Sequence, residues 1–277
     1  FVPVYWMATE DHDFEEIGFF NFKDKKIQWN REAEGAVGEL SLEGLEEVYL
    51  QIQKIFGPGE TGKYLTNLFE KAYLHHENLA DATRFLANAL FGNYGLVIVD
   101  GNDAELKKCF KPFAEKEILE NLSFKQISET TKRLTALGYP EQVHPREINL
   151  FYLKESLRER IVKEENRFVI HDTSVSFSEE EILEELKKHP ERFSPNALLR
   201  PLYQEVILPN LCYIGGGGEL AYWFQLKDYF GKVQVPFPIL LLRNSALLIS
   251  KKSSEKIKKL NLEMTFFGCH TSGWLIH

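Results

Sequence analysis

Three continuous apolar runs stand out along the chain, and each of them ends in polar residues. Phe1–Thr9, Gly95–Val99 and Pro238–Leu242 are shorter than a typical helix and show no regular alternation of apolar and polar positions. Such runs are typical of strands that are buried on both faces, as in parallel sheets. We therefore predict an α/β fold in which these three strands lie side by side in a parallel sheet.

Helical periodicity accounts for much of the chain between these strands. Ser-x-x-Gln and Ser-x-x-Glu are capping boxes, so helices should begin at Ser123 and Ser178. Pro195 and Pro201 indicate two further helix starts, because proline is favoured in the first turn. Helices are predicted from Ser41 to the Gly57-Pro58 stop, at 62–75, at 79–91, from Ala104, from Ser123 to Leu137 and from Glu219 to Phe230.

Short strands replace helices in the middle of the chain. Ile148–Leu153, Arg158–Glu164 and Phe168–Ile170 predict a β-meander. We therefore interpret 139–192 as a small α+β subdomain that is inserted into the core. A separate hairpin is predicted at Phe19–Trp29.

The insertion divides the α/β core, which we place at 1–138 and 193–250. We expect 251–277 to be a truncated C-terminal helical extension, and its last part, 264–277, has no heptad pattern. The chain starts directly in an apolar run, without a basic leader. We therefore expect that an upstream segment of the protein precedes it.

Charge and cysteine content narrow the classes of function. The chain has 277 residues, with 33 basic and 41 acidic side chains and a formal net charge of −8, which is unfavourable for nucleic acid or an anionic membrane as a partner. Its apolar runs are all far shorter than the ~20 residues that span a bilayer. Three well-separated cysteines show no metal-ligand spacing, so we predict no structural zinc site. So few cysteines are typical of a reducing compartment, and we expect a cytoplasmic protein.

Charged residues crowd the end of the first apolar run. Glu10, Asp11, His12 and Asp13 place three carboxylates and an imidazole in four consecutive positions. An imidazole beside carboxylates can exchange protons near neutral pH, and carboxylates can also hold a metal ion or bind an amine. The alternative is an acidic start to the next helix, which its dipole would favour. We predict Asp11, His12 and Asp13 as catalytic residues and Glu10 as a substrate-binding residue, with no resident metal.

Polar residues also follow the other two runs. Asp100 and Asn102 end the second run and can meet a hydroxyl, an amine or a metal, or else form a turn and helix cap. Arg243 and Ser245 follow the third run in the same way. Ligands of open α/β sheets bind beyond the carboxyl ends of the strands, so all four are candidate binding residues.

A glycine-rich turn is the other candidate site. Gly215, Gly216, Gly217 and Gly218 follow Tyr213 and precede Glu219 at a helix start, where backbone N–H groups can receive an anion. The spacing is neither G-x-G-x-x-G nor a P-loop, and a flexible turn is the alternative.

Arginine supplies a possible clamp for a carboxylate or a phosphate. Arg200 and Gln204 are four residues apart and would share one helix face. The alternative is an ordinary surface arginine. We include both residues among the candidate binding groups.

Four blocks of sequence, in order along the chain, resemble the bacillithiol-biosynthesis family BshC, the cysteine ligases. The resemblance extends over roughly residues 1–263. The blocks are FVPVYWMATEDHDFEEI, HHENLADATRFLANALFGNYGLVIVDGND, RPLYQEVILPNLCYIGGGGELAYWFQL and the following PxxxxRNS segment.

The resemblance implies a Rossmann-like core with inserted segments and a C-terminal coiled coil that supports a homodimer. It also implies the last step of bacillithiol synthesis, in which cysteine forms an amide with the amine of glucosaminyl-malate. ATP is a possible cofactor, because related nucleotidyl-transferring ligases activate a carboxylate as an adenylate. An adenylyl-transferring enzyme with another acceptor, and a non-catalytic module that binds nucleotides or anions, stay open as alternatives.

The sequence departs from the family at three places. The family's glycine turn commonly reads IGGPGE, whereas this chain has IGGGGE, with Gly217 in place of the proline. From the resemblance, we expect the family's N-terminal segment with its first strand to lie outside this sequence, and 264–277 stands where a helical continuation is expected. These losses would affect independent activity and dimerisation.

Overall fold

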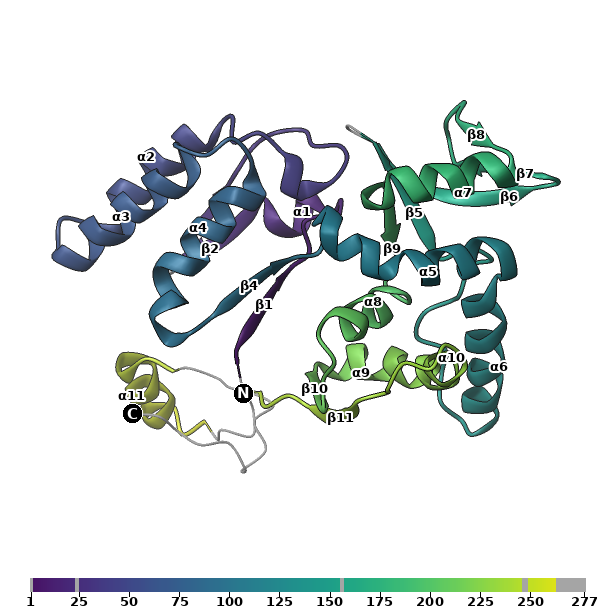
Figure 1. The fold of residues 1–277 in the computed structure, drawn as a ribbon. Helices are drawn as coiled ribbons and strands as arrows, with labels where there is room; N and C mark the ends of the chain where they lie inside the picture. Colours follow the sequence, from purple (N-terminus) through teal and green to yellow (C-terminus); the bar gives the residue numbers. More distant parts are fainter. Residues whose placement is uncertain (1, 23–24, 155–156, 246–248, 263–277) are drawn as a thin grey trace.

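The computed structural model describes residues 2–22, 25–154, 157–245 and 249–262, and the atypical tail at 264–277 lies outside this part. Helices and parallel strands occur together, which confirms the α/β class (Figure 1). The parallel strands are β1 (Val4–Met7), β4 (Val97–Asp100), β10 (Cys212–Gly215) and β11 (Ile239–Leu242).

The parallel strands form two separate pairs in the described part of the chain. β1 pairs with β4, with Met7 opposite Asp100, and β10 pairs with β11, with Gly215 opposite Leu242. The three predicted strands are therefore present, but the prediction that they lie side by side in one parallel sheet is wrong, because β11 pairs with β10 and not with β1 or β4. Each pair brings two carboxyl ends to one edge, which is where the sequence places its polar residues.

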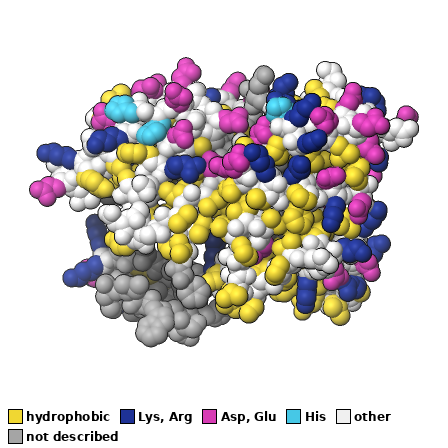
Figure 2. Space-filling view, viewed as in Figure 1, with side chains coloured by type: hydrophobic (Ala, Val, Ile, Leu, Met, Phe, Trp, Pro, Cys, Tyr) yellow, Lys and Arg dark blue, Asp and Glu magenta, His cyan; other side chains and the backbone are white. Residues whose placement is uncertain are grey.

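These strands are less buried than their apolar runs predict. Val4 is 40% exposed, Val97 46% and Ile239 67%, so the prediction of burial on both faces is wrong. Both strands of a two-stranded sheet are edge strands, so their side chains have fewer neighbours than those of a central strand. Figure 2 shows hydrophobic side chains gathered in the middle of this face of the molecule, around α8 and the β10–β11 pair.

The N-terminal part packs helices beside a hairpin. The predicted hairpin at Phe19–Trp29 is confirmed as β2 (Phe19–Phe22) and β3 (Lys25–Gln28). Ile27, Ile52 and Ala82 form part of a separate core here. The helices are α1 (Phe14–Ile17), α2 (Leu45–Phe56), α3 (Glu60–Tyr73) and α4 (Leu79–Phe91).

The predicted meander is one part of a five-stranded antiparallel sheet of order β8-β7-β6-β5-β9. The capping box at Ser178 is confirmed, because the Ser178 side chain and the Glu181 side chain bond each other's backbone N–H groups at the start of α7. The helix start at Pro195 is wrong, because this residue ends a strand that pairs with β5. The elements are β5 (Leu150–Lys154), β6 (Leu157–Glu164), β7 (Arg167–Ile170), β8 (Ser176–Phe177), α7 (Glu179–Lys188) and β9 (Phe193–Pro195).

A large core joins this sheet to the remaining helices, because Phe168 of the sheet, Phe110 of α5 and Trp223 of α9 belong to one buried cluster. The helices are α5 (Ala104–Glu120), α6 (Leu122–Ala136), α8 (Arg200–Ile207), α9 (Gly217–Trp223), α10 (Lys227–Lys232) and α11 (Lys251–Lys259). Short 3₁₀ turns lie at η1 (Val37–Glu39), η2 (Gly92–Tyr94), η3 (Pro190–Arg192) and η4 (Phe224–Leu226).

Two further helix predictions need correction. Ser123 is not a helix cap, because α6 begins at Leu122 and the Ser123 hydroxyl donates to the buried carboxylate of Glu117. The single helix predicted from Glu219 to Phe230 is divided into α9, η4 and α10. No helix in the described part of the chain is both long and apolar enough to cross a bilayer.

Candidate active site

The ends of β1 and β4 are joined by a group of polar side chains that we call the strand-end cluster. Its members are Thr9, Glu10, Asp11, His12, Asp13, Glu39, Arg84, Asp100, Asn102, Lys107 and Arg158. The parallel pairing brings Thr9 and Asp100 together, and the Thr9 hydroxyl donates a hydrogen bond to Asp100 Oδ1. Asp100 also accepts from the Asn102 N–H at 2.9 Å and forms an ion pair with Arg84 at 3.3 Å.

Glu10 lies inside the protein instead of facing a substrate. Its carboxylate accepts a hydrogen bond from the Lys107 ammonium group, which also donates to Phe193 O at 3.1 Å. Glu10 is 5% exposed and Lys107 is 1% exposed. Burial lowers the pKa of Lys107, and the nearby Glu10 carboxylate opposes that shift. We therefore reassign Glu10 from substrate binding to holding the loop that carries Asp11, His12 and Asp13.

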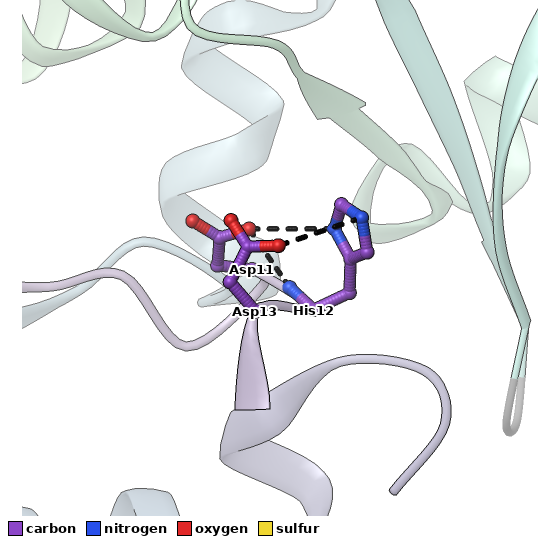
Figure 3. Close-up of side chains that lie close together, drawn as sticks. All are labelled: Asp11, His12 and Asp13. Atoms are coloured by element: carbon purple, nitrogen blue, oxygen red, sulfur yellow. Dashed lines mark hydrogen bonds and ion pairs between the residues drawn. The ribbon is translucent and has the colours of Figure 1, made fainter. Parts of the chain in front are cut away.

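Asp11, His12 and Asp13 lie close together at the surface (Figure 3). His12 Nδ1 is 3.4 Å from Asp11 Oδ1, and His12 Nε2 is 3.8 Å from Asp13 Oδ1. The three side chains are about half exposed, so they are open to a substrate. Their ligand atoms lie within 4.8 Å of one another, but the guanidinium group of Arg158 already contacts His12 Nδ1 and would repel a cation.

A small polar cavity of about 190 Å³ adjoins this cluster. Thr9, Glu39, Asp100 and Asn102 are among its walls. Asn102 donates to Glu39 at 3.3 Å. Burial raises the pKa of Glu39, and the bond from Asn102 opposes that shift. The walls therefore present mainly acceptors, which suit an ammonium group or hydroxyls.

A larger cavity of about 620 Å³ lies between β1, the hairpin and helices α2 to α4. The residues that line it include no charged side chain. Chemistry that moves protons or binds acidic groups needs polar groups in the walls, so we place the candidate active site at the smaller polar cavity.

The end of β10 carries a second group, which we call the glycine-turn cluster. Its members are Arg200, Gln204, Tyr213, Gly215, Gly216, Gly217, Gly218, Glu219 and Arg243. Arg200 and Gln204 share a face of α8, and Arg200 Nη1 donates to Gln204 Oε1 at 2.9 Å. Arg200 Nη2 is 3.4 Å from Glu219 Oε1, which also accepts from the Tyr213 hydroxyl. Burial and the adjacent Glu219 carboxylate raise the pKa of Tyr213 to about 12, so Tyr213 stays a hydrogen-bond donor.

The glycines of this turn differ in the space around them. A Cβ at Gly215 would lie 2.9 Å from the Tyr213 ring, so a side chain at this position would require the ring to shift. A Cβ at Gly216 would lie 3.5 Å from the guanidinium carbon of Arg243, and Gly218 has no atom that close. Gly216 precedes the first turn of α9, and Gly217 begins it. Arg243 and Ser245 are exposed beyond β11.

Helix α8 is the element that reaches both clusters. It carries Arg200 in the glycine-turn cluster and Tyr203, whose hydroxyl donates to Gly101 O at 3.1 Å beside the strand-end cluster. The Tyr203 ring also meets Trp6 of β1 edge to face, with ring centroids 5.3 Å apart. Within the described residues no hydrogen bond or ion pair joins the two clusters directly. The strand ends and the glycine turn could still share one pocket for a single substrate, and such a pocket, with His12, Asp100 and Gly216 in it, stays a prediction.

Five members of the strand-end cluster were not predicted from the sequence: Thr9, Glu39, Arg84, Lys107 and Arg158. Lys107 had a usable signal, because it lies on the same helix face as Phe110, Ala114 and Ile118. A lysine in such an apolar stripe has to find a buried partner. The other four have no local pattern that indicates their contacts, since their partners are far away in sequence: Thr9, Glu39, Arg84 and Arg158.

The sequence matches one protein family along most of its length. The model of the family described as "Bacillithiol biosynthesis BshC, N-terminal Rossmann-like domain" matches residues 1–244. The chain belongs to the BshC family. The two parallel strand pairs and their helical connections are consistent with the Rossmann-like domain that this family model describes.

Curated relatives carry the name "Putative cysteine ligase BshC". The relative from Flavobacterium johnsoniae is 57% identical over 263 residues, which are 95% of this chain and 49% of the relative. The relative from Christiangramia forsetii is 56% identical over 268 residues, and the one from Bacillus cereus is 33% identical over 278 residues. Their coverage is 95% of this chain in both comparisons, and 50% and 51% of the relatives. The chain therefore spans about half the length of the curated relatives that it matches.

Proposed function

We propose that this chain is the Rossmann-like part of a ligase that joins cysteine to glucosaminyl-malate in the last step of bacillithiol synthesis. The bond formed is an amide between the cysteine carboxyl group and the sugar amine. Family membership supports the reaction class, and the chemistry of the two clusters supports a substrate that carries both carboxylates and an amine.

The observation that carries this proposal is the pair of arginines beside the glycine turn. Arg243 lies against Gly216, and Arg200 is held by Gln204 and Glu219. Arginine binds carboxylates through paired hydrogen bonds, and the malate part of the acceptor has two carboxylates. Arg200 and Arg243 would hold them, and the backbone N–H groups of the turn would receive a further anion.

The strand-end cluster would hold the amine side of the reaction. The acceptor-rich cavity beside Asp100 suits a sugar hydroxyl or the ammonium group of cysteine. Amide formation needs a deprotonated amine, and one of Asp11, His12 and Asp13 would bind the amine or take its proton. Their exposure at the end of β1 gives a substrate direct access.

ATP is a separate part of the proposal. The residues suit its phosphates, because Gly217 and Gly218 leave their side of the turn open and Arg243 supplies a positive charge nearby. When bound, ATP would supply activation of the cysteine carboxyl group. The chain's own contribution would be to hold the phosphates and to keep the substrate carboxylates in place.

An assay of a complete polypeptide of the relatives' length tests the proposal. With cysteine, glucosaminyl-malate and ATP, mass spectrometry should detect the amide product, and the same assay without ATP tests whether ATP activates the carboxyl group. Arg200→Ala should lower kcat/KM by about 10- to 100-fold, because it removes charged hydrogen bonds to the substrate. Arg192→Ala is the matched control, since Arg192 is likewise paired with a glutamate, Glu185, but lies outside both clusters.

The outcomes separate the alternatives. An adenylyl-transferring enzyme would form product with another amino acid or acceptor in place of cysteine or glucosaminyl-malate. A binding module would bind ATP or malate in calorimetry and form no product. Equal kinetics of the Arg200→Ala and Arg192→Ala variants would remove Arg200 from the site. We also propose a cytoplasmic homodimer, which light scattering on the same polypeptide tests for its oligomeric state.

A further inference from the structure

Arg158 reaches the strand-end cluster from the antiparallel sheet. Its side chain is only 7% exposed, and its guanidinium group lies over the ring of Phe151, with the guanidinium carbon 4.0 Å from the ring centroid. Nη1 contacts His12 Nδ1 and lies 3.8 Å from Asp11 Oδ1. Nε is buried and has no hydrogen-bond partner among the described residues. The guanidinium group is therefore buried and held beside His12 by its packing on the Phe151 ring.

The chemistry of the two groups fixes where the His12 proton lies. A guanidinium group has five N–H donors, has no acceptor and stays charged in proteins. A nitrogen that it contacts at hydrogen-bonding distance must offer a lone pair. His12 Nδ1 is therefore the acceptor, and the proton of the neutral imidazole lies on Nε2.

The other groups around the ring agree with this placement. Asp13 Oδ1 faces Nε2 at 3.8 Å, so a carboxylate lies on the side that carries the proton. Asp11 Oδ1 lies 3.4 Å from Nδ1 and would favour a proton there, but the guanidinium nitrogen is closer to Nδ1 at 2.5 Å. Phe151 faces the ring as an apolar neighbour, with centroids 6.1 Å apart.

We propose that Arg158 is a positioning residue that holds His12 as the Nε2–H tautomer. His12 then presents a hydrogen-bond donor to the substrate and has no lone pair on its exposed nitrogen. The group that takes the proton from the substrate amine must then be a carboxylate, Asp11 or Asp13. The tautomer itself follows from the geometry alone, and its role in the reaction rests on the proposed function.

Nitrogen NMR of the histidine rings tests the tautomer without substrate. The complete polypeptide is labelled with ¹⁵N-histidine at neutral pH, and the His12 signals are assigned by their loss in the His12→Gln variant. Wild-type protein should show a protonated Nε2 and an unprotonated Nδ1. In Arg158→Gln the proton should move wholly or partly to Nδ1, because Asp11 then has no competitor there.

Two further variants keep the test decisive. Arg158→Lys retains a donor-only cation and should retain the Nε2–H tautomer, which rescues the loss seen with glutamine. Arg167→Gln removes an exposed arginine from the same sheet and should leave the His12 signals unchanged. A protonated Nδ1 in the wild type, or the same tautomer in wild type and Arg158→Gln, would overturn the proposal.

The activity assay separates this inference from the proposed function. If Arg158→Gln moves the proton and also lowers kcat with little change in KM, the positioning role is supported. If the proton moves and kcat stays at the wild-type value, His12 is not a donor in the reaction, and the catalytic part of the inference fails. Absence of the amide product in the wild type would contradict the proposed function and leave the NMR result as it stands.

Discussion

Lys107 and Glu10 form a buried ion pair between residues that are 97 positions apart in the sequence. Lys107 extends from α5, and Glu10 follows β1, so the pair fixes the loop that carries Asp11 and His12 to the large core. Because the pair lies at the base of the candidate active site and not on its surface, its effect on stability can be tested apart from substrate binding.

Removal of one member of this pair should be costly. Lys107→Met leaves the Glu10 carboxylate buried without a partner, and we expect the free energy of unfolding to fall by about 3–5 kcal/mol. Urea denaturation followed by tryptophan fluorescence measures the loss. The double variant Glu10→Gln/Lys107→Met should recover most of it, because no charge then stays unpaired. An equal loss in the single and double variants would contradict a charge-based explanation.

The glycine turn should become more stable with the residue that the family commonly has. Gly217 is the first residue of α9, and the preceding Gly216 has an extended conformation with ψ 160°. Proline is favoured at this helix position and requires an extended residue before it. Gly217→Pro should therefore raise the free energy of unfolding by about 0.4–1 kcal/mol.

The neighbouring position provides the control for that substitution. Gly218→Pro would place proline after a helical residue, which is unfavourable, so this variant should be destabilised. Thermal unfolding of both variants measures the difference. If both prolines destabilise the protein equally, the backbone of the turn does not have the described conformation.

The confirmed capping box provides a second stability test. Ser178→Ala removes the side-chain acceptor for Glu181 N and should cost about 1 kcal/mol. Ser250 caps α11 in the same way, but α11 has no buried residue. Ser250→Ala should therefore leave global unfolding unchanged. Equal losses in the two variants would show that α11 contributes to the cooperative core.

Glu117 should make stability depend on pH. Burial raises the pKa of this carboxyl group, and hydrogen bonds from Ser123 and Asn149 oppose the shift. A raised folded-state pKa means that the folded protein binds the proton more tightly than the unfolded chain does. The resulting stabilisation is complete below the unfolded-state value and is lost as the pH rises through the folded-state value.

The measurement compares wild type with Glu117→Gln from acid to neutral pH. Wild-type stability should fall relative to the variant as the pH rises above 4.5, the ordinary value for this group. Glu115→Gln, at an exposed position of the same helix, controls for the loss of one charge. A constant difference between wild type and Glu117→Gln across this range would contradict the direction of the pKa shift.

Sequence patterns predicted correctly those helices whose ends are determined by neighbouring residues. The helix predicted at 79–91 is α4 with the same bounds, and the Ser178 capping box begins α7. Residues with distant partners were placed less well. Pro195 belongs to a strand because β5 lies beside it, and Ser123 bonds to Glu117 instead of capping its own helix. Strand pairing and burial of this kind depend on contacts across the whole fold. The periodicity of a sequence does not show these contacts.

The same distinction applies to the candidate site. Strand ends could be located in the sequence, so Asp100 and His12 were found there, and Arg200 was found from its four-residue spacing to Gln204 on a helix face. The Lys107–Glu10 pair and the contact of Arg158 with His12 depend on helices and sheets that meet only in three dimensions. The apolar runs of β1 and β11 indicated strands correctly, but their exposure depends on which neighbours cover them.

Binding of glucosaminyl-malate tests most directly whether the two clusters serve one acidic substrate. Calorimetric titration of a complete polypeptide should show binding that is weakened by Arg200→Ala in the glycine-turn cluster and by Asp100→Asn in the strand-end cluster, but not by Arg192→Ala. Wild-type affinity in either cluster variant would contradict a shared site.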